Sequence, residues 1–490
     1  MVYMCRNSYL LMIQTLVFTS ENNNLYIYDI QSRLSILVHP EFEKVYKKRI
    51  NVNPYYLKKY AYLKDHGFFE ELKLSEFIPL EESMVRENIA NTHQIVFETT
   101  DVCNLNCTYC ALGELYEGYG ERNGKRMDLH NAINLLRYIF DLKPKNENQL
   151  LCISFYGGEA LLNVNFIKQI VELSKQLNTN KGIQLEFSMT TNATLIHKYI
   201  DFLVVNKFHL LISLDGNEDN HSYRVFGKNR KNSFHSVIEN MDMIQRKYPD
   251  YFSNYIDFNA VLHDRNSVND ISEFIYNRYN KIPRIAELNL RDIKLDKKDV
   301  FSKMYHSKRS SEVELQEKNP ELFRLSHNQL SSYEDLINFL KYCSINYYIS
   351  NINALLNFEE KYLQTNTCTP FLKKIFFTSC NKLLPCEKIS YQHSMGEVGE
   401  NIEIDVPQIT KLYNSYYKRL KNDCQNCYAY RFCGTCLFHL NNIDNVDIED
   451  FVCENFYNQK DYKIYLCRIF SFLEEYPSDF LEILENVIIE

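Results

Sequence analysis

The sequence lacks tryptophan and contains no run of about 18 consecutive apolar residues. A membrane-spanning helix needs about 20 such residues, so we expect no membrane partner. The chain also lacks an excess of positive charge, since 55 Lys and Arg against 63 Asp and Glu give a net charge of −8. This balance argues against a general binder of the phosphate backbone, and we expect no nucleic-acid partner. Hydrophobic residues make up 45% of the 490, enough for several buried cores, and the length predicts roughly two to four domains.

Cysteine is too scarce for a small disulfide scaffold but is strongly clustered. Fifteen cysteines in 490 residues are about 3%, whereas such scaffolds reach roughly 8–10%. Three fall within Cys103–Cys110 and eight within Cys368–Cys453. An odd total of cysteines, most of them in tight clusters, indicates metal or iron–sulfur ligation in a reducing compartment. Tyr9–Ile13 resembles the apolar part of a secretion signal, but Gln14 interrupts it and no small-residue cleavage site follows, so we expect a cytoplasmic protein.

The first ninety residues are predicted to form a small unit of three strands followed by two helices. Runs rich in β-branched and aromatic residues between polar turns predict the strands, and helical spacing of apolar residues predicts the helices. The predicted strands are Leu10–Thr19, Leu25–Ile30 and Leu34–Val38, and the helices are Glu41–Lys48 and Tyr55–Lys64. This order is that of a winged-helix-like domain.

From about residue 94 the pattern changes to alternating strands and helices, which is typical of a parallel α/β sheet or barrel. The predicted strands are Ile95–Glu98, Leu151–Tyr156, Gln184–Met189, Leu210–Leu214 and Ile256–Leu262, and the helices are Leu129–Asp141, Val164–Gln176, Leu195–Asn206 and Ser233–Arg246. The loops after these strands carry Cys, Glu, Asn and Asp residues. Because the loops at strand carboxyl ends build the active sites of such sheets, we expect the site at this edge.

The first cysteine cluster has CxxxCxxC spacing and comes just after a predicted strand. Its members are Cys103, Cys107 and Cys110. Three thiolates can hold three irons of a [4Fe–4S] cluster and leave the fourth iron open. The alternative is a zinc ion held by these thiolates and completed by His93 or His130, because structural zinc takes four ligands.

With aromatic Tyr109 before its last cysteine, this motif resembles the signature of the radical S-adenosylmethionine (SAM) superfamily. The resemblance implies a partial (β/α)6 barrel and an enzyme that generates a 5′-deoxyadenosyl radical from SAM. It also implies a cofactor-binding role for residues in the motif and at the ends of the next strands, with a turn or capping role as the alternative. These residues are Tyr109, Gly157, Gly158, Glu159, Thr191, Asn192, Ser213, Asp215 and Arg224.

The second cysteine cluster resembles the SPASM domain, which holds two auxiliary [4Fe–4S] clusters. By position, the distal cluster would be held by Cys424, Cys427, Cys433 and Cys453. The nearer cluster would be held by Cys368, Cys386 and Cys436, with Cys380 as the candidate fourth ligand. Asn381 replaces the family's usual Gly, and the Cys433–Cys436 spacing is one residue shorter than usual, so the role of Cys380 stays open. Zinc ribbons are the alternative for paired CxxC units.

The resemblance as a whole implies a maturase of ribosomally made peptides that installs a thioether or carbon–carbon crosslink. SAM and three [4Fe–4S] clusters would be its cofactors. Its partners would be a precursor peptide, whose leader binds beside the strand at Leu34–Val38, and an electron donor such as flavodoxin or ferredoxin. One alternative is a sulfatase-maturating enzyme that makes formylglycine, in which Glu387 would be the substrate-deprotonating base; the alternative for Glu387 is a surface glutamate without a catalytic role. Another is a zinc adaptor without catalysis.

These motifs predict a division of the chain into five parts. Residues 1–90 would form the peptide-recognition-like domain and 91–290 the radical SAM partial barrel. Residues 291–360 would form a bridging helical region, 361–457 the SPASM domain and 458–490 a helical tail.

Overall fold

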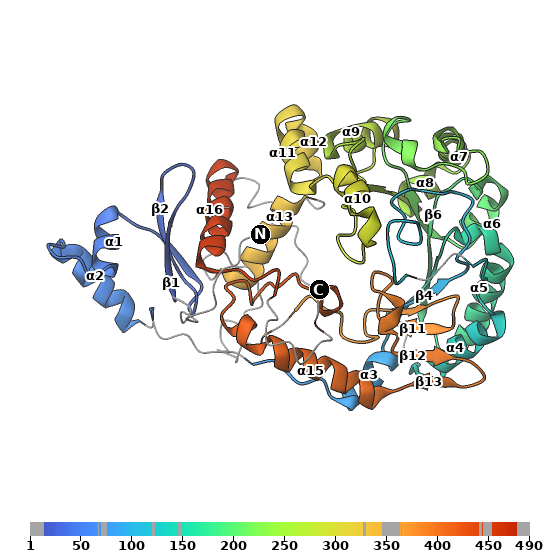
Figure 1. Ribbon diagram of the computed structural model, residues 1–490, viewed down its shortest axis with the longest axis horizontal. Helices are drawn as coiled ribbons and strands as arrows, with labels where there is room; N and C mark the ends of the chain where they lie inside the picture. Colours follow the sequence, from blue (N-terminus) through green and yellow to red (C-terminus); the bar gives the residue numbers. More distant parts are fainter. Residues whose placement is uncertain are drawn as a thin grey trace. The chain divides into compact units, whose positions relative to one another are not determined.

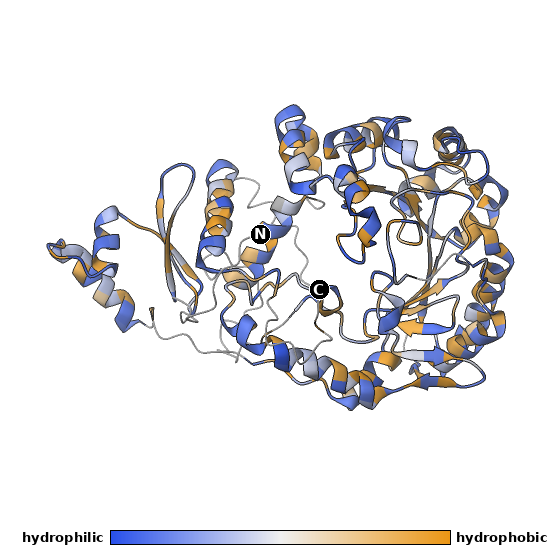
Figure 2. Cartoon of the chain, in the orientation of Figure 1, coloured by the Kyte–Doolittle hydropathy of each residue, from blue (hydrophilic) through white to orange (hydrophobic). Residues whose placement is uncertain are grey.

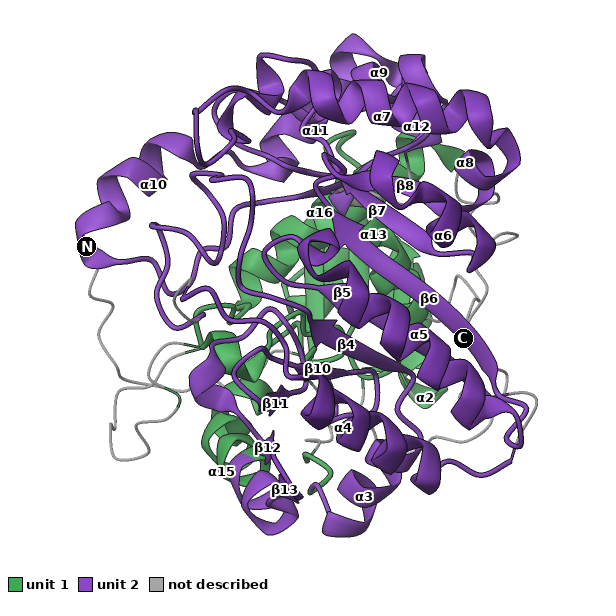
Figure 3. Ribbon diagram, turned by 90° about the vertical axis from the view of Figure 1, so that its right-hand side faces the viewer, with its two compact units in different colours: residues 1–79, 332–367, 413–490 green, residues 80–331, 368–412 purple. Residues whose placement is uncertain are grey.

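The computed structural model describes residues 14–66, 68–69, 76–119, 123–145, 149–326, 330–344, 363, 365–440, 443 and 453–477. The chain forms two compact units, coloured separately in Figure 3. Unit 1 consists of Met1–Pro79, Ser332–Thr367 and Tyr413–Glu490, and unit 2 of Leu80–Ser331 and Cys368–Leu412. The five-part division differs from this one and stays a prediction. None of the helices described is both long and apolar enough to cross a membrane.

Unit 2 is built on a ten-stranded sheet in the order β13-β12-β11-β10-β4-β5-β6-β7-β8-β9. Its strands are β4 (Gln94–Glu98), β5 (Leu150–Tyr156), β6 (Gln184–Thr191), β7 (His209–Ser213), β8 (Ile256–Val261), β9 (Arg284–Ala286), β10 (Ile375–Phe377), β11 (Lys382–Leu384), β12 (Gly396–Val398) and β13 (Ile402–Ile404). Strands β4 to β9 are parallel and follow chain order, as in a singly wound partial barrel. The predicted α/β class with six such strands is confirmed.

Strand β10 extends the parallel sheet beyond β4, and β11 to β13 continue it in antiparallel pairs. Ile375 pairs with Ile95 and Phe377 with Phe97. The strand that precedes Cys380 therefore lies beside the strand that precedes Cys103, as Figure 3 shows for β4 and β10. This pairing brings the two cysteine regions of unit 2 to the same edge of the sheet.

In unit 2 one helix precedes β4 and the others follow the strands of the parallel sheet (Figure 1). They are α3 (Glu82–Ala90), α4 (Leu129–Leu142), α5 (Val164–Asn178), α6 (Ile200–Val205), α7 (Phe234–Lys247), α8 (Pro249–Tyr255), α9 (Val268–Tyr279), α10 (Lys298–Met304), α11 (Lys308–Lys318) and α12 (Pro320–Leu325). In Figure 2 hydrophobic and hydrophilic residues alternate along α4 and α5, and the buried ones include Leu135, Ile139 and Ile170. The single helix predicted for Leu195–Asn206 is wrong, because Tyr199, at φ −131°, separates a short 3-10 turn from α6.

Unit 1 contains a three-stranded antiparallel sheet of β1 (Thr15–Thr19), β2 (Leu25–Asp29) and β3 (Leu34–Leu37). The helices α1 (Pro40–Tyr46) and α2 (Pro54–Asp65) follow it, each beginning with a proline after a capping side chain. Ile27, Val38 and Phe42 form the core under one face of the sheet. The predicted order of three strands and two helices is confirmed over the described residues. The other helices include α13 (Ser331–Asn338), α15 (Val406–Gln425) and α16 (Gln459–Glu475).

The second face of this small sheet is covered by α16, from the other end of the sequence. The ring of Phe470 lies 5.2 Å from Phe18 and 4.6 Å from Tyr26, centroid to centroid. The Glu474 carboxylate accepts hydrogen bonds from Tyr26 Oη at 2.7 Å and from Asn24 Nδ2 at 3.0 Å. The N-terminal sheet thus shares a hydrophobic core with α16 in unit 1.

Candidate active site

The cysteines of the first cluster lie together in the loop between β4 and α4. Burial raises the pKa of the Cys107 thiol to about 12, and the Cys103 and Cys110 thiols act in the same direction while the Arg224 guanidinium opposes them. The Cys110 N–H donates to Cys107 O at 3.2 Å, which turns the chain between these two thiols. Within the described residues, no three His, Cys, Asp or Glu side chains gather closely enough to hold one metal ion.

A buried ion pair between Asp215 and Arg224 contacts this loop through Tyr109. The Arg224 guanidinium donates to both carboxylate oxygens of Asp215, from Nε at 2.8 Å and from Nη2 at 2.9 Å. Tyr109 donates its hydroxyl to the same carboxylate and stacks on His263 at 5.6 Å. Burial alone would raise the pKa of Asp215, but Arg224 outweighs it and holds that pKa well below its usual range. Tyr109, Asp215 and Arg224, which were predicted to bind SAM, are thus joined to one another.

The Gly157-Gly158-Glu159 segment joins the end of β5 to the cysteine loop. A Cβ on Gly157 would lie 2.3 Å from Thr100 O, and one on Gly158 would lie 2.2 Å from Val102 O. Only glycine allows this approach, and Gly157 also has a φ of +132°. The backbones are joined by hydrogen bonds from Gly158 N to Thr100 O at 2.8 Å and from Glu159 N to Val102 O at 2.9 Å. These glycines therefore permit close backbone packing within the protein.

The Glu159 carboxylate connects the loops after β5 and β6. It is 1% exposed and accepts hydrogen bonds from Thr191 Oγ1 at 2.7 Å, Asn192 N at 2.8 Å and Leu161 N at 3.1 Å. Burial raises its pKa, and these donors oppose the rise. Ser213, at the end of β7, donates to Asn259 Oδ1 at 3.3 Å. The structure thus brings Glu159, Thr191 and Asn192 into one network beside the cysteine loop.

A polar cavity of about 380 Å³ lies on the face of the sheet that carries Ser154 and Ser188. These two hydroxyls are hydrogen-bonded to each other, and Gln94 Nε2 donates to Ser154. The cavity is lined chiefly by Gln94, Val96, Ser154, Tyr156, Ser188, Thr190, Leu211, Asp257, Arg284, Lys374 and Glu387. The lining includes Tyr156 and Thr190, near the carboxyl ends of β5 and β6, and also Gln94 and Asp257, near the amino ends of β4 and β8, so the cavity extends along the strands.

Glu387 lines this cavity and is paired with a lysine that the sequence analysis did not single out. Lys374 Nζ lies 3.1 and 3.0 Å from the two Glu387 carboxylate oxygens. Burial would raise the pKa of Glu387, but the Lys374 ammonium outweighs it and keeps the pKa below its ordinary value. The neighbouring Cys386 thiol, whose pKa burial raises to about 12, interacts with the Cys368 thiol. Cys368 and Cys386 are therefore close in unit 2, and completion of their site by Cys436 stays a prediction.

Cys380 lies on the hairpin between β10 and β11, beside a second buried network. The Glu98 carboxylate, 1% exposed, accepts hydrogen bonds from Ser379 N at 2.8 Å, Ser379 Oγ at 2.9 Å and Tyr391 Oη at 2.7 Å. Lys125 Nζ lies 3.5 Å from Cys380 Sγ. This network ties the hairpin to the end of β4, and the role of Cys380 as a ligand stays a prediction.

The four cysteines predicted to hold the distal cluster lie together in unit 1. The Cys424 thiol interacts electrostatically with those of Cys427, Cys433 and Cys453, and burial raises its pKa. Cys427 N donates to Cys424 O at 3.3 Å, as expected of a tight CxxC turn. Tyr457 N donates to Cys427 Sγ at 3.4 Å. Cys427 is buried and the other three are partly buried, and four thiols gathered in this way suit an iron–sulfur cluster, in which each thiol binds its own iron.

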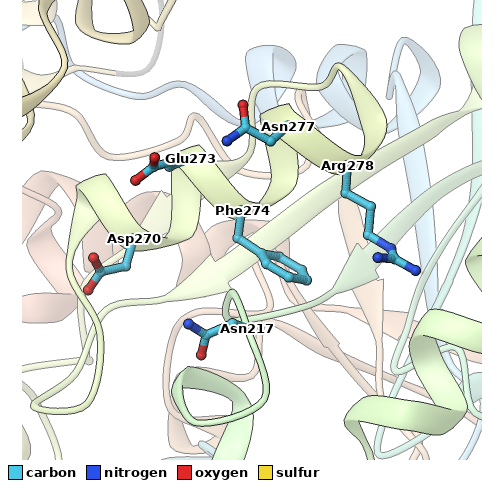
Figure 4. A pocket seen from close by; sticks show the side chains of 6 residues that line it. All are labelled: Asn217, Asp270, Glu273, Phe274, Asn277 and Arg278. Carbon is cyan, nitrogen blue, oxygen red and sulfur yellow. The ribbon is translucent and has the colours of Figure 1, made fainter.

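Another pocket lies on the surface of unit 2, between α9 and the loop after β7 (Figure 4). It has a volume of about 650 Å³, and Figure 4 shows Phe274 at its centre with Asp270 and Glu273 along one side. Arg278 lines it too, and its guanidinium donates to the Asp242 carboxylate. Neither the cysteine loop nor any residue predicted to bind SAM contributes to this pocket.

Comparison with known proteins finds a family model over the parallel sheet. Residues 97–274 match the model described as "Radical SAM superfamily". The chain is 27% identical over 292 residues to the "Radical SAM cyclopropyl synthase TigE" of Paramaledivibacter caminithermalis. The aligned region covers 56% of this chain and 58% of that protein. It is 30% identical over 151 residues to the "Cysteine-type anaerobic sulfatase-maturating enzyme" of Clostridium novyi. This alignment covers 30% of this chain and 39% of that enzyme. The chain thus spans little more than half the length of TigE and less of the second relative.

A solved structure described as "Native anSMEcpe with bound AdoMet" shares the fold. The alignment covers 80% of this chain and 99% of that one, with a TM-score of 0.52 and 20% sequence identity. The predicted radical SAM fold is confirmed by this match and by the family model.

Proposed function

Since residues 97–274 form a radical SAM domain, we propose that this protein is a peptide maturase that uses SAM and a [4Fe–4S] cluster to modify a ribosomally made precursor. The observation that carries the proposal is the gathering of three thiols in the loop after β4, in the unit that also contains the polar cavity. When bound, the cluster would supply one electron to SAM, whose cleavage yields a 5′-deoxyadenosyl radical that removes a hydrogen atom from the substrate.

The residues of this loop fit such a cluster. Cys103, Cys107 and Cys110 supply one thiol for each of three irons, and the fourth iron would be left for SAM. Without a metal, burial opposes ionisation of the Cys107 thiol, whereas a bound metal deprotonates a thiol outright. Leu105 N donates to Cys103 Sγ at 3.3 Å, which supports the sulfur as a charged ligand.

The polar cavity is the proposed place of the substrate. A thioether or carbon–carbon crosslink removes two hydrogen atoms from the peptide, so an electron acceptor is needed besides the radical. We propose that the auxiliary cysteine sets hold two further [4Fe–4S] clusters that serve this purpose, and that flavodoxin or ferredoxin donates the first electron.

Formylglycine formation in a sulfatase is the second candidate, and the similarity to the Clostridium novyi enzyme supports it. In that reaction Glu387 would take a proton from the substrate. The ion pair with Lys374 argues against this role, because it stabilises the charged carboxylate and weakens it as a base. We therefore keep the peptide crosslink as the leading proposal.

The test is to replace Cys103, Cys107 and Cys110 together with Ala. We expect the anaerobic wild-type protein to contain about twelve irons, four for each of three clusters, and to release 5′-deoxyadenosine from SAM. The variant should lose 5′-deoxyadenosine formation and keep roughly two thirds of its iron. A colourless wild-type protein that contains zinc would favour the adaptor, and would contradict the proposal.

We further propose that a leader peptide adds a strand to β3, the edge of the small sheet. Val38 N donates to Leu25 O on β2, so the alternation of a strand turns the Leu37 N–H away from β2. The Leu37 side chain is 59% exposed. Tyr56 and Tyr60 of α2 pack on the core beside β3 and would form the walls of side-chain pockets.

Deletion of residues 1–90 would not test this proposal, since it would uncover the face of α16 that packs on Phe18 and Tyr26. Leu37→Pro is the better variant, because it removes an outward N–H and edge strands tolerate proline. A labelled candidate precursor should bind Leu37→Ala with near wild-type affinity and Leu37→Pro at least tenfold more weakly. Equal affinity of the two variants would refute strand addition at β3.

A further inference from the structure

The side chain of Asn192 contacts the sulfur of Cys103. It lies just after β6, is 7% exposed, and places Nδ2 3.7 Å from Cys103 Sγ and 2.9 Å from Asn104 Oδ1. The Leu105 N–H approaches the same sulfur at 3.3 Å. Two N–H groups from different loops therefore face this one thiol.

The neighbouring residues fix which end of the Asn192 amide faces the sulfur. Thr194 N, which can only donate, lies 3.1 Å from one amide atom, and Thr194 Oγ1 lies 2.7 Å from it. That atom must be the carbonyl oxygen, so the NH₂ group faces Cys103 and Asn104. Asn104 Nδ2 donates to Thr194 Oγ1 at 2.8 Å, which leaves the Asn104 oxygen to accept one hydrogen of Asn192. The second hydrogen is left for the sulfur.

The loop that carries Asn192 is held on both sides. The backbone N–H of Asn192 donates to Glu159 Oε2 at 2.8 Å. The next residue, Ala193, is fully buried with a φ of 59°, a left-handed conformation that a non-glycine residue adopts only where its surroundings impose it. Asn240 of α7 donates from Nδ2 to Ala193 O at 2.8 Å. The amide therefore has little freedom to turn away from the sulfur.

We propose that Asn192 acts on the cluster through Cys103, by donating a hydrogen bond that raises the reduction potential of the cluster. The inference rests on the proposed function, in which Cys103 is a cluster ligand. Reduction adds negative charge to the cluster and its sulfurs, so an N–H donor stabilises the reduced state. This role differs from the SAM contact that the family resemblance implies for Asn192. A net hydrogen bond changes an equilibrium roughly 2- to 12-fold, and a tenfold change corresponds to about 59 mV for one electron.

Potentiometric titration followed by electron paramagnetic resonance tests the proposal in the full-length protein. The signal of the first cluster is the one absent from the variant in which Cys103, Cys107 and Cys110 are Ala. Asn192→Leu removes the donor and should shift the oxidised-to-reduced ratio at a fixed potential roughly 2- to 12-fold toward the oxidised form. Asn192→Asp keeps both bonds to Thr194 but places a carboxylate oxygen near the sulfur, so its shift should be larger.

Asn240→Ala is the matched control. It weakens the same loop by removing the bond to Ala193 O but leaves the donor to the sulfur in place, so its potential should equal that of the wild type. Wild-type potentials in both Asn192 variants would overturn the inference. So would loss of the cluster from both of them while Asn240→Ala retains it, because Asn192 would then be needed for assembly. A wild-type protein without this signal would instead refute the proposed function.

Discussion

The buried Glu98 carboxylate offers a quantitative test of how the two cysteine regions of unit 2 are joined. Glu98→Ala removes the acceptor of three donors: Ser379 N, Ser379 Oγ and Tyr391 Oη. Ser379 is buried, so neither of its donors can turn to water, and each unsatisfied donor costs about 1–3 kcal/mol. Tyr391 is half-buried, and its hydroxyl can be hydrated. We therefore expect the free energy of unfolding to fall by about 2–6 kcal/mol.

Two matched variants separate the contributions. Tyr391→Phe removes only the half-buried donor and should cost less than Glu98→Ala, and Glu98→Gln keeps one acceptor oxygen for Ser379 and should lie between them. Chemical unfolding of the cluster-loaded protein measures all three, and iron content is measured alongside. If Glu98→Ala is no less stable than Tyr391→Phe, the network does not hold the hairpin as argued. A loss of iron in Glu98→Ala would support Cys380, next to Ser379, as a ligand.

The remaining predictions concern other buried charges. Burial lowers the pKa of Lys143 from 10.5 to about 8, so the unfolded chain binds more protons between these values and wild-type stability should rise across pH 8 to 10.5. The rise should be roughly 3 kcal/mol at most, and urea titrations of Lys143→Met should show it flattened. Glu159→Gln should lower 5′-deoxyadenosine formation more than Glu387→Gln does, because Glu159 holds the loop after β6, and equal losses would contradict this. Lys374→Met should destabilise unit 2 by about 3 kcal/mol or less, and adding Glu387→Gln should recover much of that loss in a double-mutant cycle.

Sequence periodicity predicted β4 to β8, which have five to eight residues and end in polar loops, but it missed β9, which has three residues. It predicted β5 at Leu151–Tyr156, and the structure begins that strand one residue earlier. Strand β10 was missed, since three residues carry almost no periodic signal and its partner β4 lies some 280 residues earlier. The pairing of β10 with β4 depends on packing between distant segments, which a local pattern does not encode.

In the candidate site, too, the sequence predicted the residues that are close in sequence and missed the contacts that only the fold creates. Cysteine spacing pointed to the residues of the first loop, and Asn104 within that loop could have been noticed as a polar neighbour of the thiols. Lys374 had no such signal, because its partner Glu387 is reached only through the fold of the hairpin. The predicted contacts of Asp215 and Arg224 with SAM did not anticipate that these two side chains would pair with each other.

The packing of α16 on β1 and β2 also bears on synthesis of the chain. Glu21 N donates to Ser471 Oγ across 450 residues of sequence. At roughly 5–20 residues per second, a ribosome needs about 20–90 s to make that interval. During this time Phe18 and Tyr26 have left the ribosome while Phe470 does not yet exist, so one face of the small sheet stays uncovered. Chaperone binding to nascent chains is therefore expected to persist until the codons for α16 have been translated.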